Sequence, residues 1–240
     1  MFNPKTPELA TFQKTYPGRV SKLETFFDAP TGVYIDYANA RQRLGSASWQ
    51  IDLCKLKALL DSFGTVTCQK FYFGTLCGDK KSEGFIHRVK KIGFDVQTKP
   101  VKIMDISIDA TSISTGSPDI LQHFISPGLL RSLKLDAIEY LNDQLRDLNK
   151  QGITKLKERK CNFDVEIGTA MRLDNHLKQS ENFCLWSGDS DFANTVECLL
   201  DDKRKVTVFG TGGKISYELN GLRSKGLEIF DVRKRIIPRF

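Results

Sequence analysis

Carboxylates stand directly after two of the apolar, strand-like runs in this chain. Asp36 follows the first run, and Asp189 and Asp191 follow a second one much later in the sequence. A further acid, Asp164, begins a segment with helical periodicity. Each aspartate alone could be a helix N-cap. Acids at two separate strand ends are harder to explain by capping, because crowded carboxylates repel one another unless a cation or a proton intervenes.

A group of carboxylates of this kind suits a hard divalent cation. Mg²⁺ and Mn²⁺ prefer oxygen ligands and often keep bound waters, and such a cation can activate water for hydrolysis. The three histidines are scattered and none stands beside a serine or cysteine, so a nucleophilic triad has no support. The six cysteines contain no C-x-x-C pair, and we expect free thiols.

Apolar periodicity predicts strands that alternate with helices. Such alternation implies right-handed βαβ units and an α/β, three-layer fold with a mostly parallel central sheet. In open sheets of this type, sites gather at the carboxyl ends of the strands. The predicted strands are 32–35, 66–73, 94–98, 182–186, 205–209 and 227–230, and the predicted helices are 51–63, 80–92, 164–177, 192–200 and 215–224.

Two stretches depart from this rhythm. Residues 1–30 are polar and contain four prolines, which predicts an N-terminal arm with a short helix over 7–14. We expect residues 31–240 to form one domain with an insertion near 104–155. Within the insertion, 105–119 predicts a loop or small hairpin, and 127–150 predicts one amphipathic helix. This helix either packs on a core or binds a partner, and a homodimer through it is left open.

Three motifs occur in an order that resembles a known family. They are Tyr34-Ile35-Asp36-Tyr37-Ala38-Asn39, Phe163-Asp164-Val165-Glu166-Ile167 and Leu185-Trp186-Ser187-Gly188-Asp189-Ser190-Asp191-Phe192. Together they resemble the NYN domain, a PIN-like ribonuclease family that includes the LabA-like proteins. The strand and glycine of 206–210 fit the same pattern. The resemblance implies a PIN-like Rossmannoid fold, a site for Mg²⁺ or Mn²⁺, and hydrolysis of RNA phosphodiester bonds, with an endonuclease expected.

The resemblance also implies roles for single residues. Asn39 would be a polar partner near the scissile phosphate, Ser187 would hydrogen-bond a carboxylate, and Glu166 would support the site. The residues expected to be catalytic are Asp36, Asn39, Asp164, Asp189 and Asp191, and the four aspartates among them are expected to bind the cation.

Two departures from the family pattern leave an alternative open. Ala170 occupies a position where many members carry an aspartate, and Glu166 or Asp174 could stand in for it. Cys161 occupies a position where members often carry a lysine. The alternative function is therefore a non-catalytic RNA-binding or assembly module on a PIN-like fold with a weakened metal site.

The charge of the chain agrees with an RNA partner. The 240 residues carry a formal net charge of +7, and basic residues cluster at 80–102, 155–160 and 233–235, which would suit a phosphate backbone. The residues expected to contact RNA are Arg41, Arg43, Lys160 and Lys214.

Other functional classes find less support. Phosphatases of the haloacid dehalogenase type carry D-x-D after the first strand. Here Asp36 is the first aspartate, but Ala38 stands in place of the second. A P-loop over 210–215 lacks its first glycine and its Ser/Thr. The sequence contains no apolar run of about 18 residues, so no membrane-spanning helix is expected. The first residues lack the apolar core of a secretory signal, so we expect a cytoplasmic protein.

Overall fold

The computed structural model describes residues 1–40, 51–210 and 215–231. The chain divides into two compact units: residues 1–100 with 161–240 form the first, and residues 101–160 form the second. The first unit is called the sheet unit below and the second the inserted unit.

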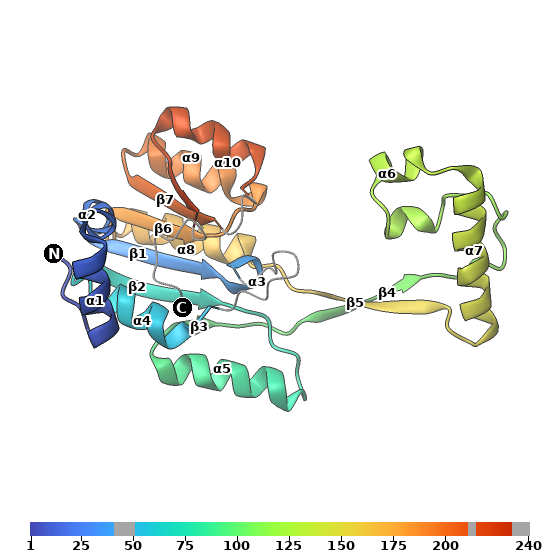
Figure 1. Ribbon diagram of the computed structural model, residues 1–240, viewed down its shortest axis with the longest axis horizontal. Coiled ribbons are helices and arrows are strands. Elements are labelled where there is room, and N and C mark those ends of the chain that lie inside the picture. Colours follow the sequence, from blue (N-terminus) through green and yellow to red (C-terminus); the bar gives the residue numbers. More distant parts are fainter. Residues whose placement is uncertain (41–50, 211–214, 232–240) are drawn as a thin grey trace. The chain divides into compact units, whose positions relative to one another are not determined.

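The sheet unit is built on six strands in the order β3-β2-β1-β6-β7-β8 (Figure 1). Every described pairing in this sheet is parallel, which confirms the predicted α/β class. The chain runs outward from β1 in one direction and from β6 in the other, so β1 and β6 flank a topological switch point, where open sheets bind ligands. The strands are β1 (Thr31–Asp36), β2 (Val66–Tyr72), β3 (Asp95–Gln97), β6 (Asn182–Trp186), β7 (Lys205–Gly210) and β8 (Glu228–Asp231).

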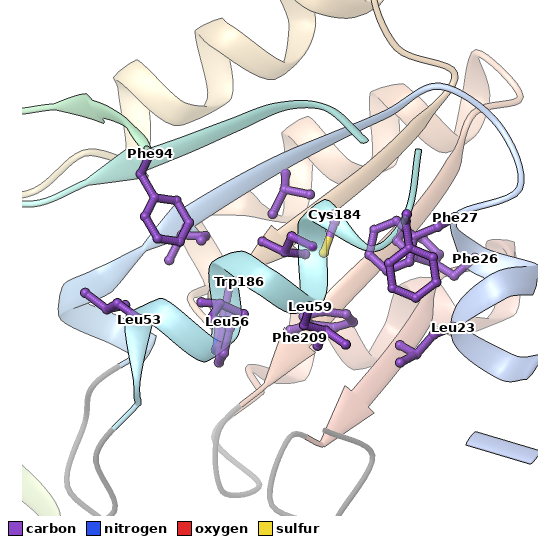
Figure 2. Packing of buried hydrophobic residues seen from close by; sticks show 14 of the residues in the cluster. Leu23, Phe26, Phe27, Leu53, Leu56, Leu59, Phe94, Cys184, Trp186 and Phe209 are labelled. Atoms are coloured by element: carbon purple, nitrogen blue, oxygen red, sulfur yellow. The ribbon is translucent and has the colours of Figure 1, made fainter. Parts of the chain in front are cut away.

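Helices from the first part of the chain cover one face of the sheet. They are α1 (Pro7–Thr15), α2 (Pro17–Phe26), α4 (Leu53–Asp61) and α5 (Lys80–Ile92). Alternate strand residues such as Val33 and Ile35 point into the same apolar cluster as these helices. Figure 2 shows part of this cluster, to which Leu56 of α4 and Trp186 of β6 both belong.

Helices from the last part of the chain cover the opposite face. They are α8 (Asp164–His176), α9 (Ala193–Asp201) and α10 (Tyr217–Gly221), accompanied by the short 3-10 turns η2 (Ser190–Phe192) and η3 (Leu222–Lys225). The strand residues that alternate with the first set, among them Tyr34, Phe183 and Leu185, pack here. The two buried faces make the sheet the middle of three layers.

Residues 1–30, which were expected to form an arm with one short helix, contain the two helices α1 and α2. Their side chains Phe12, Leu23 and Phe26 are buried in the cluster shared with β1 and α4. Thr6 caps α1 by accepting a hydrogen bond from the backbone N–H of Leu9. The polar composition and prolines mark the helix starts, since proline is well tolerated in the first turn.

The inserted unit combines a β-ribbon with short helices. Strands β4 (Lys102–Ser107) and β5 (Lys155–Lys160) pair antiparallel and enclose η1 (Leu121–His123), α6 (Pro127–Ser132) and α7 (Leu135–Lys150). The predicted single helix over 127–150 is wrong, because Leu133 and Lys134 adopt extended backbone and separate α6 from α7. The strand over 155–160 was not predicted from its highly charged sequence.

One polar face of α7 holds the irregular chain of the inserted unit. Asn149 accepts a hydrogen bond from the backbone N–H of Ala110 and donates to the carbonyls of Ile108 and Ile153. Asn142 donates to two further carbonyls of this stretch. The apolar residues of α7 that suggested core packing, Ile138, Leu141, Leu145 and Leu148, are only half-buried. The homodimer through 127–150 stays a prediction.

None of the helices in the described residues is long and apolar enough to cross a membrane.

Candidate metal centre

The carboxyl ends of β1 and β6 are tied together by hydrogen bonds between side chains and backbone. Ser187 Oγ donates to Asp36 Oδ2 at 3.3 Å, and the backbone N–H of Asn39 donates to Asp36 Oδ1 at 3.3 Å. The Asn39 side-chain oxygen accepts the N–H of Gly188 at 3.2 Å. Because β1 and β6 are neighbours with Ile35 opposite Trp186, Asn39 fixes the start of the loop that carries the next acids.

The loop after β6 presents two aspartates. The N–H of Asp189 donates to Ser187 Oγ at 3.4 Å, and Asp189 Oδ1 accepts the N–H of Asp191 at 3.3 Å. Asp189 is therefore the N-cap of η2, as the capping interpretation allows. Capping uses only one of its carboxylate oxygens.

A third carboxylate joins these two from the first residue of α8. Asp164, Asp189 and Asp191 each offer an oxygen, and these oxygens lie within 4.8 Å of one another. The N–H of Asp164 donates to Asn162 Oδ1 at 2.9 Å, which fixes the start of the helix. We call these three residues the acidic cluster. Asp36 is not a member of this group. It is linked to the group through Ser187, whose hydroxyl donates to Asp36 and accepts the N–H of Asp189.

The acidic cluster is electrostatically unfavourable without a counter-charge. Burial and the neighbouring carboxylates of Asp191 and Asp189 raise the pKa of Asp164 to about 6. Burial also raises the pKa of Asp36, although hydrogen bonds from Asn39 and Ser187 oppose that effect and Asp189 reinforces it. One oxygen of Asp164, Oδ2, is buried without a hydrogen-bond partner. An all-oxygen group with a buried free oxygen fits Mg²⁺ or Mn²⁺.

Neither acid that could replace the missing aspartate at position 170 joins the cluster. Glu166 forms an ion pair with Lys99. Burial would raise the pKa of Glu166, but Lys99 outweighs it and the pKa is lowered. Asp174 forms a buried ion pair with Lys70 at 2.6 Å. Ala170 itself lines a pocket of about 370 Å³ in which both of these lysines take part.

A second pocket, of about 470 Å³, lies directly beside the acidic cluster. Asp164 and Asp191 line it together with Arg172, Asn162 and Asn194. We call it the α8–α9 pocket. Arg172 is exposed, and among the described residues it has no ion-pair partner.

Sequence reasoning missed Arg172, although its spacing carried a signal. Asp164, Gly168 and Arg172 follow one another at intervals of four, so they share a helix face. Gly168 allows close approach there, since an added Cβ would lie 2.9 Å from Thr195 Oγ1 of α9.

Of the basic residues expected to contact RNA, Lys160 alone belongs to the described residues. Arg41, Arg43 and Lys214 lie outside the described residues, as does the basic segment 233–235. Lys160 ends β5 and belongs to the inserted unit. Cys161 is half-buried and packs against the apolar cluster of α8.

Comparison with known proteins identifies the class. Residues 130–223 match the NYN domain family, and NYN domains have a PIN-like fold, which the parallel sheet and its acidic switch point define here. A relative from Synechococcus elongatus, named Low amplitude and bright protein LabA, is 31% identical over 77 residues, which are 32% of this chain and 40% of that protein. Over this part of its length, the chain is thus similar to the LabA-like NYN proteins. The match spans less than half of the length of this curated relative.

A solved structure supports the fold alone. A protein of unknown function from Vibrio parahaemolyticus superposes with a TM-score of 0.50 and 18% identity, covering 84% of this chain and 92% of that one. The family match begins at residue 130, so Asp36 and Asn39 fall outside it. Their place at the site rests on the geometry described above.

Proposed function

We propose that this chain is a divalent-cation-dependent ribonuclease that cleaves within RNA chains, with the cation, Mg²⁺ or Mn²⁺, held by Asp164, Asp189 and Asp191. The observation that carries the proposal is the convergence of three carboxylate oxygens within 4.8 Å at a parallel-sheet switch point. The buried, unpartnered Oδ2 of Asp164 supports it further. NYN domains are associated with ribonuclease activity and RNA binding, which agrees with this proposal.

A bound divalent cation would lower the pKa of a water molecule and neutralise charge on the phosphate during hydrolysis. The side chains of the protein would bind the cation and orient the groups around it. The acidic cluster supplies the ligand oxygens, and Ser187 orients Asp36 toward the same sheet edge. Asn39 holds the loop of Asp189 and Asp191 in place through Gly188, so it acts as a positioning residue. In this proposal, Asp36 accepts a proton from water at the edge of the cluster.

We further propose that the RNA strand passes through the α8–α9 pocket. Arg172 stands eight residues after Asp164 on the same helix face, roughly 12 Å along the axis. An unpaired guanidinium at that place would bind a neighbouring phosphate and hold the strand over the acids.

A circular single-stranded RNA tests the proposal, because only an endonuclease can open it. Wild type is expected to linearise the circle with Mn²⁺ or Mg²⁺ and to stop when the cation is chelated. Asp189→Asn should lower the cleavage rate at least about a hundredfold, since it removes a ligand charge. The matched control Asp119→Asn alters an exposed aspartate of the inserted unit and should leave the rate unchanged. Equal background cleavage by wild type and Asp189→Asn would refute the proposed nuclease.

A second candidate function is RNA binding without cleavage, and Ala170 is the observation that favours it. Glu166 and Asp174, which could have replaced the missing acid, are occupied by lysines. Calorimetric titration with Mn²⁺ separates the two candidates independently of activity. A nuclease requires binding that Asp189→Asn weakens, whereas RNA binding that persists in wild type without any Mn²⁺ binding would favour the non-catalytic module.

A further inference from the structure

The β-ribbon of the inserted unit has two different faces. Residues that are directly opposite in an antiparallel pair share a face, and successive residues alternate between faces. The register pairs Arg159 with Ile103, Lys157 with Asp105, and Lys155 with Ser107. Lys155, Lys157 and Arg159 therefore project from one face, which we call the cationic face. The other face carries Met104, Ile106 and Leu156 together with Lys102, Glu158 and Lys160, so its charges are fewer and do not form a row along one strand.

Three cations on the cationic face form a regular row. They are alternate residues of β5, so their Cα atoms are about 6.7 Å apart. All residues of β5 are exposed. Among the described residues, the contact of Lys155 with Asp105 at 3.8 Å is the one ion pair that these three cations form, and at that distance in solvent it contributes little.

The ribbon as a whole carries five cations and two acids. Lys102 and Lys160 are directly opposite each other, and like charges in that relation destabilise a strand pair. A two-stranded ribbon is marginally stable in water on its own. This charge pattern is therefore costly in the free protein and becomes favourable when an extended polyanion lies along the ribbon.

We propose that the β4–β5 ribbon is an RNA-binding arm whose cationic face contacts successive backbone phosphates through Lys155, Lys157 and Arg159. The identity of the nucleic acid as RNA rests on the proposed function, whereas the binding of a polyanion rests on the ribbon itself. A repeating anion at fixed intervals matches a row of cations at fixed intervals. The contacts are to phosphates, so they hold the strand without reading its sequence.

The ribbon is a binding surface separate from the acidic cluster. The cluster belongs to the sheet unit and the row of cations belongs to the inserted unit. Each contact should release counterions from the RNA, and this gives the row a signature that a purely structural role would not have.

The test measures RNA affinity by fluorescence anisotropy at salt concentrations between about 50 and 200 mM. The full chain carries Asp189→Asn in every sample, so that the labelled RNA stays intact. The ribbon variant adds Lys155→Gln, Lys157→Gln and Arg159→Gln. The matched control instead adds Lys5→Gln, Lys14→Gln and Lys22→Gln, which are exposed residues in and before the N-terminal helices and remove the same charge. Single-stranded RNA and the matching duplex are both titrated.

We expect the ribbon variant to bind about tenfold more weakly, with a slope of log K against log salt that is less steep by about 2, as three lost phosphate contacts on a single strand predict. The control should change neither by that amount. An unchanged slope and affinity with both RNAs would overturn the proposal, and so would equal losses in the two variants. Preferential binding of poly-glutamate over RNA at the ribbon would also overturn it, in favour of an acidic protein partner.

Crosslinking covers the case in which the ribbon variant fails to fold. Ultraviolet irradiation of the Asp189→Asn chain with uridine-containing RNA should place crosslinks on peptides that contain residues 155–160, and their absence there would contradict the arm. Wild-type cleavage of RNA is measured separately. If the ribbon binds RNA but wild type does not cleave it, only the proposed nuclease is refuted. If wild type cleaves RNA without contacts to the ribbon, only the proposed RNA-binding arm is refuted.

Discussion

At the scale of single residues, the carboxylates that would bind a cation lower the stability of the folded protein, because they repel one another. Asp164 has a pKa of about 6, which is above its usual value of 3.8. A carboxyl whose pKa is raised by folding favours the folded state least when it is ionised. The destabilisation is absent below pH 4, grows as the pH rises from 4 to 6, and stays at its full size above pH 6.

We therefore predict that Asp164→Asn stabilises the cation-free protein at pH 7.5. Because Asp164 is half-buried and solvent screens part of the repulsion, the expected gain is about 1 kcal/mol. Urea unfolding with a chelator present measures it, and the gain should vanish at pH 4. Asp119→Asn, which alters an exposed aspartate, is the control. A loss of stability at pH 7.5 would show that the ionised Asp164 is not under repulsion.

A second carboxylate, that of Asp174, differs from Asp164 because a cation is paired with it. Asp174 is 3% exposed and accepts hydrogen bonds from Tyr34 Oη at 2.5 Å and Lys70 Nζ at 2.6 Å. Burial raises the pKa of Tyr34, and Cys68 and Asp174 raise it further, so its hydroxyl stays a donor. This network joins β1, β2 and α8, and its Lys70 also lines the pocket of Ala170.

Removing the cation of this network should be costly. Lys70→Met leaves a buried carboxylate with only the Tyr34 hydroxyl and the Cys68 thiol as side-chain donors, and we expect a loss of about 3 kcal/mol in the free energy of unfolding. The double variant Lys70→Met with Asp174→Asn should recover most of that loss, since no charge remains unpaired. Thermal unfolding of the three proteins measures the coupling. Additive effects of the two substitutions would contradict the ion pair.

At the scale of elements, the sequence predicts the sheet unit well and the inserted unit poorly. Strands such as β6 and β7 are short apolar runs, and their burial on both faces makes them recognisable. β5 is almost entirely charged and exposed, so its pairing with β4 leaves no apolar alternation to read. The break between α6 and α7 was missed because Leu133 and Lys134 are ordinary helix formers.

The candidate site was predictable to a similar, partial extent. Position after a strand identified Asp36, Asp189 and Asp191, because parallel strands end at one edge. The motifs could not show that Asp36 lies outside the acidic cluster. Its place depends on the hydrogen bonds that Ser187 forms with Asp36 and with the backbone of Asp189. Arg172 was missed because its spacing from Asp164 predicts a shared helix face but not the pocket that α8 and α9 form there.

The inserted unit depends on one helix for the order of its irregular chain, which leads to a prediction for Asn149. Asn149→Ala would leave the buried N–H of Ala110 and the carbonyl of Ile108 unsatisfied. Groups of this kind cost about 1–3 kcal/mol each when unpaired. Hydrogen exchange should therefore accelerate in residues 108–113. Gln144→Ala, on the exposed side of the same helix, should leave it unchanged, and protection that survives Asn149→Ala would contradict this role.

At the scale of the whole molecule, the two units have separate sources of stability. The sheet unit has two large apolar clusters on its two faces, whereas the inserted unit relies on a polar helix face and a few buried apolar residues such as Ile108 and Leu121. A ligand stabilises the part of a protein that binds it and only in its folded form. The acidic cluster lies wholly in the sheet unit.

We therefore predict that Mn²⁺ stabilises the sheet unit and leaves the stability of the inserted unit unchanged. Hydrogen exchange followed by proteolysis should show added protection in peptides of β6, α8 and α9, and none in residues 108–150. RNA added to the Asp189→Asn chain with a chelator should add protection at 155–160, since the ribbon needs no cation. Asp164→Asn should abolish the Mn²⁺ effect and keep the RNA effect, because the first depends on carboxylate ligands and the second on phosphate contacts. Protection of both units by Mn²⁺ alone would mean that they unfold as one cooperative body.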